Sequence, residues 1–356
     1  VDVAVEAGIG AAAHFADAAY AEAGAEVLAD REALLRSADV VLRVGRPTPA
    51  EVALYREGAA HVGFVDPFND RELLGALERH GVTSVSMELM PRTTKAQPMD
   101  ALSSQHSIGG YAMVILAAQR FGRVFPMMVT PSGTLQPARV LVIGAGVAGL
   151  QAIATARRLG ARVEAFDTRP DTREQVRSLG ARFVEIDLGE TGQTAGGYAR
   201  ELTEEQKARQ REGLKKAVTQ ADIVITTAAL FGRPAPRIVF ADMLAGMKPG
   251  SVVVDYAAAS GGNVEGSAEI VARGEEEGIV ADGVRLIAMR NYAGLVPTDA
   301  SAMYAANLFA FVKEFYDAER GVLELDREGD AILAGCVLTR GGRVVNQTVL
   351  ERLHLA

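Results

Sequence analysis

The stretch Arg139-Val-Leu-Val-Ile-Gly144-Ala-Gly146-Val-Ala-Gly149-Leu decides the fold of this chain, because a run of strand-forming residues leads into three glycines and then into a helical pattern. Gly144 permits a tight turn, Gly146 lets the backbone approach a phosphate, and Gly149 lets the helix pack on the strand. The N-terminus of such a helix offers N–H groups and a positive dipole end to an anion. We therefore predict a dinucleotide-binding turn here.

The segments beside the turn favour this interpretation over a purely structural turn, where glycine serves only a positive φ. Residues 148–159 have the pattern of a helix, and Ala161-Arg-Val-Glu-Ala-Phe-Asp167 is a second predicted strand. That strand ends in a carboxylate about 20 residues after the glycines, as in dinucleotide-binding βαβ units.

Asp167 indicates which nucleotide binds. A carboxylate at this position accepts hydrogen bonds from both ribose hydroxyls and repels a 2′-phosphate, which favours NAD over NADP. Arg169 could hold a 2′-phosphate instead. With Asp167 present, we prefer to interpret Arg169 as a solvated loop charge or an adenine-stacking group.

Length and composition indicate a globular enzyme of about two domains. The 356 residues are 49% hydrophobic and 23% charged, and the net charge of −8 argues against nucleic acid or an anionic membrane as a direct partner. The single cysteine, Cys336, excludes an internal disulfide and fits a reducing compartment. No apolar stretch reaches the roughly 18 residues that a membrane span needs.

The sequence shows no signal peptide, no internal repeat and no low-complexity tail. The chain begins at Val1, without Met and already inside a strand-like run. We therefore expect that an N-terminal segment precedes it in the natural protein.

The first region alternates short strands with helical segments, which predicts a parallel, doubly wound sheet. The predicted strands are Val1–Val5, Asp39–Val44, His61–Val65 and Thr83–Met87, and the predicted helices are 30–37, 50–58 and 70–80. A polar loop, Pro91–Asp100, then leads into a long apolar helix at Ser103–Phe121.

A proline-rich stretch, Pro126–Pro137, marks the approach to the second region. Beyond the glycine turn, strands are predicted at Arg182–Ile186, Asp222–Thr227, Ser251–Asp255 and Val284–Ala288. The glycine-rich segment 187–201 has almost no apolar content, so we expect a mobile lid there. A helix at Asp299–Phe315 and a hairpin at Ala331–Val345 complete the chain.

These patterns predict an α/β protein with two Rossmann-like, doubly wound domains and a cleft between them. The first domain would be discontinuous, residues 1–110 with 298–356, and the nucleotide-binding domain would comprise residues 111–297. Met303, Tyr304, Leu308 and Phe309 have helical spacing and are most simply explained as core residues.

Several motifs together resemble one family. They are Pro91-Arg-Thr-Thr-Lys-Ala-Gln-Pro-Met-Asp-Ala-Leu-Ser-Ser-Gln105, Gly144-Ala-Gly-Val-Ala-Gly-Leu150, Phe166-Asp-Thr-Arg-Pro170, Gly196-Gly-Tyr-Ala199, Thr226-Thr-Ala228, Gly232-Arg-Pro-Ala-Pro236 and Met247-Lys-Pro-Gly-Ser-Val-Val-Val-Asp255. In this order they resemble the NAD-binding component, domain I, of the proton-translocating nicotinamide nucleotide transhydrogenase. The resemblance covers nearly the whole chain, and the related alanine dehydrogenases share the architecture.

The resemblance implies roles for particular residues. Arg92, Gln97, Asp100 and Ser103 fall where the family contacts the nicotinamide and its ribose, with Pro98 and Met99 in the same loop. The pyrophosphate would lie against residues 146–149, which adds Val147 and Ala148, and the adenosine side against Asp167, Thr168 and Arg169. Further implied contacts are the lid tyrosine Tyr198, Gln210 and Ala229. No metal site is expected.

Each of these residues also has a structural interpretation. Arg92 could be a surface charge, Gln97 and Ser103 could be turn and helix-cap residues, and Asp100 could cap the helix that follows. Tyr198 could pack on the surface. The segments 257–260 and 291–297 depart from the family pattern, so the resemblance gives no reliable contacts there.

The reaction type follows partly from which side chains are missing. Reduction of a ketone or imine needs a positioned acid, whereas hydride transfer between two nicotinamide rings needs none. Of the five histidines, only His106 lies near the expected site, and we interpret it as a polar residue at the end of the long helix.

An alanine dehydrogenase would need a lysine and a histidine in the first domain. The segment 41–47 carries Arg43 where the lysine is expected, and 64–67 has no histidine. Lys95 remains a possible substitute acid, so this enzyme stays an alternative. A catalytically silent NAD sensor is a second alternative.

The resemblance thus implies an NAD(H)-binding subunit that transfers hydride directly to NADP(H) held by a partner component. A membrane-spanning component would couple the transfer to proton translocation. The chain would be a homodimer in the cytoplasm, peripheral on the cytoplasmic face of the inner membrane through these partners.

Overall fold

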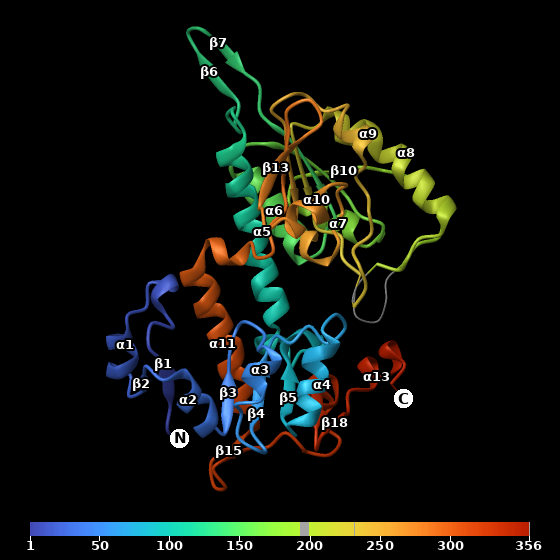
Figure 1. The fold of residues 1–356 in the computed structure, drawn as a ribbon. Coiled ribbons are helices and arrows are strands. Elements are labelled where there is room, and N and C mark those ends of the chain that lie inside the picture. The colour runs from blue at the N-terminus through green and yellow to red at the C-terminus, as the bar shows by residue number, and fades with distance from the viewer. Residues whose placement is uncertain (193–198, 231, 356) are drawn as a thin grey trace. The chain divides into compact units, whose positions relative to one another are not determined.

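The computed structural model describes residues 1–192, 199–230 and 232–355. Tyr198 and the glycines of the predicted lid at 193–197 lie outside these residues. The chain divides into two compact units, Val1–Gln105 with Val296–Ala356 and His106–Leu295 (Figure 1). The boundaries predicted from the sequence fall a few residues from these divisions.

The second unit is built on a seven-stranded sheet of order β10-β9-β8-β11-β12-β14-β13. Neighbouring strands are parallel except at the edge, where β13 runs antiparallel to β14. The strands are β8 Arg139–Ile143, β9 Arg162–Phe166, β10 Arg182–Phe183, β11 Ile223–Thr226, β12 Val252–Asp255, β13 Glu277–Val280 and β14 Val284–Ile287.

Helices cover both faces of this sheet, as its buried strands require. Successive residues of β8 enter different cores: Val142 packs with Ile153 on one face, and Leu141 packs with Leu214 on the other. The doubly wound fold predicted from the glycine turn is therefore confirmed for this unit. The helices are α5 Ala101–Arg120, which begins in the first unit, α6 Val147–Arg158, α7 Thr172–Ser178, α8 Glu204–Gln220, α9 Ala241–Leu244 and α10 Ser267–Ala272.

The first unit contains a five-stranded mixed sheet of order β18-β17-β5-β4-β3. Its three predicted parallel strands are present, and β17 and β18 add an antiparallel edge. Phe311 and Phe315 of α11 pack in one core with Val62 and Val85 of the sheet. The elements are β3 Val40–Leu42, β4 Ala60–Gly63, β5 Thr83–Ser86, β17 Val337–Arg340, β18 Arg343–Val344, β15 Tyr316–Asp317, β16 Val322–Leu323, α1 Asp17–Glu22, α2 Arg31–Ser37, α3 Pro49–Val52, α4 Arg71–Arg79, α11 Pro297–Phe315 and α13 Gln347–Leu353.

Two expectations for the first unit are wrong. The strand predicted at the N-terminus is β1, Ala4–Glu6, and it pairs only with β2, Glu26–Leu28, in a separate small sheet. Neither face of β1 is fully buried, so it lacks the continuous apolar surface of a central parallel strand. The hairpin predicted at 331–345 begins instead with the helix α12, Ala331–Cys336, which Asp330 caps by accepting from the N–H groups of Ile332 and Leu333.

The proline-rich approach to the second unit also differs from expectation. It forms a hairpin of β6, Met128–Thr130, and β7, Gly133–Leu135, which extends from the unit in Figure 1. Pro131 occupies its turn, where a fixed φ is favourable. The third predicted helix, at 50–58, is present only as the four residues of α3.

The expectation that all four helix-spaced apolar residues of α11 are core residues is wrong for two of them. Tyr304 and Leu308 are buried with Phe311 and Phe315 along one face. Met303 is 45% exposed and Phe309 is 67% exposed, because they lie off that face. His106 is likewise an interior residue of α5, not an end residue, and its ring lies edge-on to Tyr256 at 5.4 Å.

Among the helices of the described residues, none is both long and apolar enough to cross a membrane.

Candidate functional site

The glycine turn follows β8 directly, and each of its three glycines has a different physical reason. Gly144 has φ of +98°, and a Cβ there would lie 2.7 Å from Oγ1 of Thr227. A Cβ on Gly149 would overlap the carbonyl oxygen of Gly144. These two glycines are therefore required by the packing of the turn itself.

Gly146 is different, because nothing in the described part of the protein requires a glycine at this position. Its φ of −82° and ψ of −165° suit any residue, and a Cβ there would meet only Nη2 of Arg169, at 4.0 Å. Gly146 is also the N-cap of α6, so its open side faces the positive end of the helix. A missing side chain before open space at a helix N-terminus is what a bound phosphate needs.

Helix α6 begins directly at this turn. Val147 is partly exposed and Ala148 is buried against the core on that side of the sheet. A Cβ on Gly110 of α5 would overlap the carbonyl of Ala148, so α5 also packs closely on the start of α6. The predicted pyrophosphate contacts are thus held by tight backbone packing.

Asp167, just after β9, reaches back to the glycine turn. Its Oδ2 accepts from the backbone N–H of Ala145 at 2.7 Å. Its Oδ1 accepts from the backbone N–H and Nε of Arg169 at 2.8 and 2.9 Å, and Nη2 of Arg169 donates to Oδ2 at 2.8 Å. The hydrogen bond to Asp167 raises the pKa of Arg169.

This pairing corrects the interpretation of Arg169 as a solvated loop charge. The guanidinium is only 16% exposed, and it lies against the carboxylate that was expected to select the nucleotide. The neighbouring carbonyl of Thr168 accepts from the hydroxyl of Thr191 at 2.6 Å. Residues 167–169 are therefore a locally ordered turn at the end of β9.

The loop that follows β11 lies beside the glycine turn. Thr227 donates from its hydroxyl to the carbonyl of Gly144 at 3.0 Å, and its N–H donates to the carbonyl of Ile143. Ala229, a predicted contact, is exposed two residues further on. Gln210, another predicted contact, is buried on α8.

Sequence reasoning did not assign a role to Thr227, although the motif Thr226-Thr-Ala228 contains it. The signal is its position after a buried parallel strand, since side chains there meet at the carboxyl edge of the sheet.

The predicted nicotinamide loop belongs to the first unit. Arg92, Gln97 and Pro98 are exposed, whereas Met99 is 3% exposed and anchors the loop in the core. The loop ends at Asp100, whose Oδ1 accepts from the N–H of Ser103 at 2.9 Å and whose Oδ2 accepts from its hydroxyl at 2.6 Å. Asp100 and Ser103 therefore form the helix cap that the structural interpretation proposed.

Asn307 of α11 fixes this loop, and the sequence analysis did not select it. Its amide donates to the carbonyl of Pro98 at 2.7 Å, and its oxygen accepts from the hydroxyl of Ser104 at 2.7 Å. Asn307 is 8% exposed among apolar neighbours of α11. A polar residue on the apolar face of a predicted helix is the signal that could have found it.

The residues that an alanine dehydrogenase would use are engaged elsewhere. Lys95 pairs with Glu314 at 2.6 Å, and Arg43 pairs with Glu51 at 3.2 Å. His61 is fully buried and bonds through Nδ1 to the hydroxyl of Tyr55 at 3.2 Å. Burial lowers the pKa of His61 from 6.5 to about 3, so it is neutral at physiological pH.

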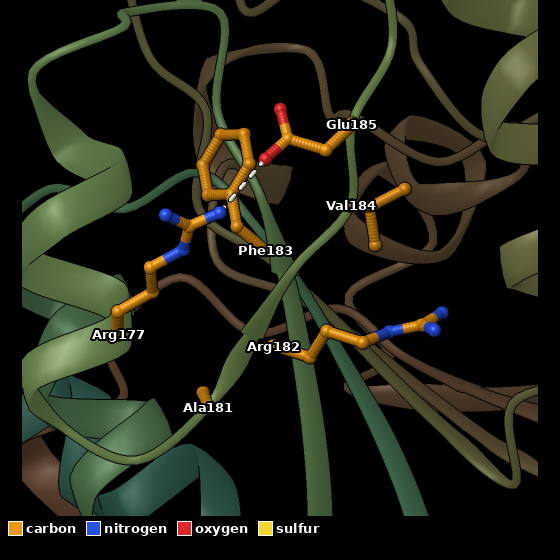
Figure 2. A pocket seen from close by; sticks show the side chains of 6 residues that line it. All are labelled: Arg177, Ala181, Arg182, Phe183, Val184 and Glu185. Atoms are coloured by element: carbon orange, nitrogen blue, oxygen red, sulfur yellow. Dashed lines mark hydrogen bonds and ion pairs between the residues drawn. The ribbon is translucent and has the colours of Figure 1, made fainter.

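A separate hollow of about 600 Å³ lies at the sheet edge beside β10 (Figure 2). Arg177 and Glu185 face each other across it at 3.2 Å. Arg182 pairs with Glu164 of β9 at 2.7 Å. None of the predicted nucleotide contacts lines this hollow, and its charges are already neutralised, so we do not assign it to the nucleotide.

The glycine turn, the carboxylate after β9 and the doubly wound sheet together define a dinucleotide-binding α/β protein. The chain belongs to the alanine dehydrogenase/PNT family: residues 1–109 match its N-terminal domain and residues 113–347 match its C-terminal domain.

Within this family the chain is similar to transhydrogenases in both sequence and structure. An NAD(P) transhydrogenase alpha subunit of Rhodospirillum rubrum is 43% identical over 354 residues, which cover 97% of this chain and 90% of the relative. The crystal structure of transhydrogenase from Sinorhizobium meliloti matches with a TM-score of 0.80 and 41% identity, covering 98% of this chain and 90% of that chain. An L-alanine dehydrogenase structure matches with a TM-score of 0.78 but 25% identity, covering 100% and 91%. The resemblance predicted from the motifs is thereby confirmed.

Proposed function

We propose that this chain is the NAD(H)-binding subunit of a proton-translocating transhydrogenase. One observation supports nucleotide binding above the others. Gly146 lacks a side chain at a helix N-terminus where neither its backbone conformation nor its packing requires a glycine. The space that a Cβ would fill there suits a phosphate oxygen. Similarity to transhydrogenase subunits supports the nicotinamide dinucleotide as the molecule that carries this phosphate.

The second unit holds the nucleotide in this proposal. Gly144, Gly146, Val147, Ala148 and Gly149 contact the pyrophosphate through the turn and the first residues of α6. The adenosine side meets Asp167, Thr168 and Arg169, and Gln210 and Ala229 complete the contacts. Asp167 selects NAD(H) by accepting from the ribose hydroxyls, which requires part of its present pairing with Arg169 to be exchanged.

The first unit orients the nicotinamide through the loop Pro91–Asp100. Arg92 and Gln97 are exposed on this loop, and Asp100 and Ser103 present a hydrogen-bonded pair at its end. Hydride transfer between two nicotinamide rings moves no proton, so these side chains need only hold the dihydronicotinamide in a reactive geometry. The ring itself supplies the hydride.

The acceptor is NADP(H) on a separate component, and a membrane-spanning component couples the reaction to proton translocation. The names of the relatives, which describe subunits, support an assembly of this kind. In this proposal the chain is a homodimer at the cytoplasmic face of the inner membrane, held there by its partners.

A label-transfer assay tests the proposal. The chain alone should bind NADH without oxidising it, and addition of an NADP-binding component should start turnover. With C4-deuterated NADH, the deuterium should appear at C4 of the NADP(H) product or its acetylpyridine analogue, without exchange into water.

Two other outcomes would contradict the proposal. Formation of alanine from pyruvate and ammonia by the chain alone would assign it to the alanine dehydrogenases, and Lys95→Met would then test for the acid. NADH binding with no transfer in the presence of a competent partner would indicate a sensor.

A further inference from the structure

The glycine turn is held from behind by the loop that follows β11. The hydroxyl of Thr227 donates to the carbonyl oxygen of Gly144 at 3.0 Å. A Cβ on Gly149 would lie 3.0 Å from the same hydroxyl oxygen, so Thr227 lies against the first and third glycines together. Its side chain thus connects the turn to the next strand of the sheet.

Asn263, in the loop after β12, holds the neighbouring residue. It is fully buried, its Oδ1 accepts from the N–H of Ala228 at 3.0 Å, and its Nδ2 donates to the carbonyl of Ala228 at 2.9 Å. The second hydrogen of Nδ2 goes to the carbonyl of Pro236 at 2.8 Å. Asn263 therefore fixes both polar groups of the residue between Thr227 and the exposed Ala229.

We propose that Thr227 and Asn263 are positioning residues of the nucleotide site. Asn263 orients the loop after β11, and Thr227 transmits that orientation to the carbonyl of Gly144. This inference rests on the proposed nucleotide binding, and it adds two residues that do not themselves contact the nucleotide.

The physical reason lies in the freedom of glycine. Gly144 adopts φ of +98° and could adopt many other conformations, so the turn needs partners to stay in one of them. Phosphate binding depends on N–H groups that already point at the anion, because ordering them upon binding weakens affinity. Hydrogen bonds from Thr227 and Asn263 supply this order before the ligand arrives.

Thr227→Val tests the first residue, because valine keeps the branched shape and loses only the hydroxyl. We expect NADH and ADP-ribose to bind about tenfold more weakly, the value of one lost hydrogen bond. Adenosine, which has no phosphate, should compete about as well as before. Thr227→Ser keeps the hydroxyl and should restore NADH affinity.

The matched control is Thr339→Val in the first unit. Thr339 is also buried and donates to a backbone carbonyl, that of Val82, at 2.8 Å. Both valine variants should lower the thermal midpoint to a similar extent, but only Thr227→Val should weaken NADH.

Asn263→Asp tests the second residue, because it replaces two donors with an acceptor in the same shape. Asn346→Asp is its control: Asn346 is 2% exposed, donates to the carbonyls of Gly335 and Val337, and accepts from the N–H of Val349. NADH affinity should fall at least about tenfold in Asn263→Asp and stay within about twofold in Asn346→Asp.

The titrations decide between the possible outcomes. Folded Thr227→Val and Asn263→Asp proteins that bind NADH as the unmodified protein does would overturn the inference while leaving nucleotide binding intact. If Asn263→Asp does not fold, the Thr227→Val and Thr227→Ser pair decides alone. An unmodified protein that binds neither NADH nor ADP-ribose would instead refute the proposed function.

Discussion

Arg169 folds back onto Asp167 and donates to both of its carboxylate oxygens, from Nε at 2.9 Å and from Nη2 at 2.8 Å. The carboxylate side chain is 6% exposed, so the pair is largely shielded from water. The residue that favours NAD and the residue that could accept NADP thus neutralise each other. Nucleotide choice depends on the pair and not on either side chain alone.

The first prediction concerns this pair. The unmodified protein should bind NADH more tightly than NADPH, since a 2′-phosphate would meet the Asp167 carboxylate. Asp167→Ser removes the repulsion and releases Arg169, which can then pair with the phosphate, so the preference should fall by at least about tenfold. Titration of both nucleotides by fluorescence or calorimetry measures it.

The double variant Asp167→Ser with Arg169→Ala is the control for the released arginine. It should bind NADPH more weakly than Asp167→Ser does. Equal affinities of the unmodified protein for the two nucleotides would contradict the selective role of Asp167.

The second prediction separates ligand contact from packing within the glycine turn. Gly146→Ala should change the free energy of unfolding by less than about 1 kcal/mol, because its φ is ordinary and its surroundings are open. It should nevertheless weaken NADH binding, because the new methyl group occupies the phosphate's approach.

Gly149→Ala should behave in the opposite way. Its Cβ would overlap the carbonyl of Gly144, so the protein should lose on the order of 1–3 kcal/mol of stability. Chemical denaturation and NADH titration on both variants give the comparison. A Gly146→Ala protein that binds NADH normally would remove the main support for the proposed site.

The third prediction concerns the nicotinamide loop. Arg92→Ala and Gln97→Ala should lower the hydride-transfer rate at saturating nucleotide by more than they raise the dissociation constant of NADH, because orientation affects the transition state. Single-turnover transfer in the presence of an NADP-binding component measures the rate. Unchanged rates would leave Arg92 as a surface charge and Gln97 as a turn residue.

The fourth prediction concerns pH. His61 has a folded pKa of about 3 against an ordinary value of 6.5, so between these values the unfolded chain takes up a proton that the folded protein does not. The contribution of neutral His61 is therefore complete above pH 6.5 and is lost as the pH falls. Its loss reaches up to about 1.4 kcal/mol per pH unit.

His61→Asn keeps an acceptor near Nδ1 for Tyr55 and removes this titration. Denaturation at pH 7.5, 6.5, 5.8 and 5.2 should show a shallower fall in stability for the variant than for the unmodified protein. This range stays above the ordinary titration of most carboxylates. Parallel curves for the two proteins would show that His61 accepts a proton in the folded state.

The nucleotide-binding unit was largely predictable because its signals are local. The glycine turn follows from residue spacing, and β8, β9, β11, β12 and β14 follow from short apolar runs with turns between them. The cap of α5 was also legible, since Asp100 and Ser103 are three residues apart and bond to each other.

Other elements escaped prediction because their stability comes from distant residues. The edge strand β13 has mixed composition and is identified only by its antiparallel pairing with β14. The exposure of Met303 and Phe309 depends on which side of α11 the core occupies, and helical spacing alone left that open.

The sequence by itself determined the fold class, the family and the glycine turn, because each is written in residues that are close along the chain. Only the tertiary structure showed that Asn307 fixes Pro98 across 209 residues and that Asn263 fixes Ala228 across 35. Such bonds depend on how the strands are ordered in a sheet. A one-dimensional pattern records which side chains can donate and accept, and the fold decides which of them meet.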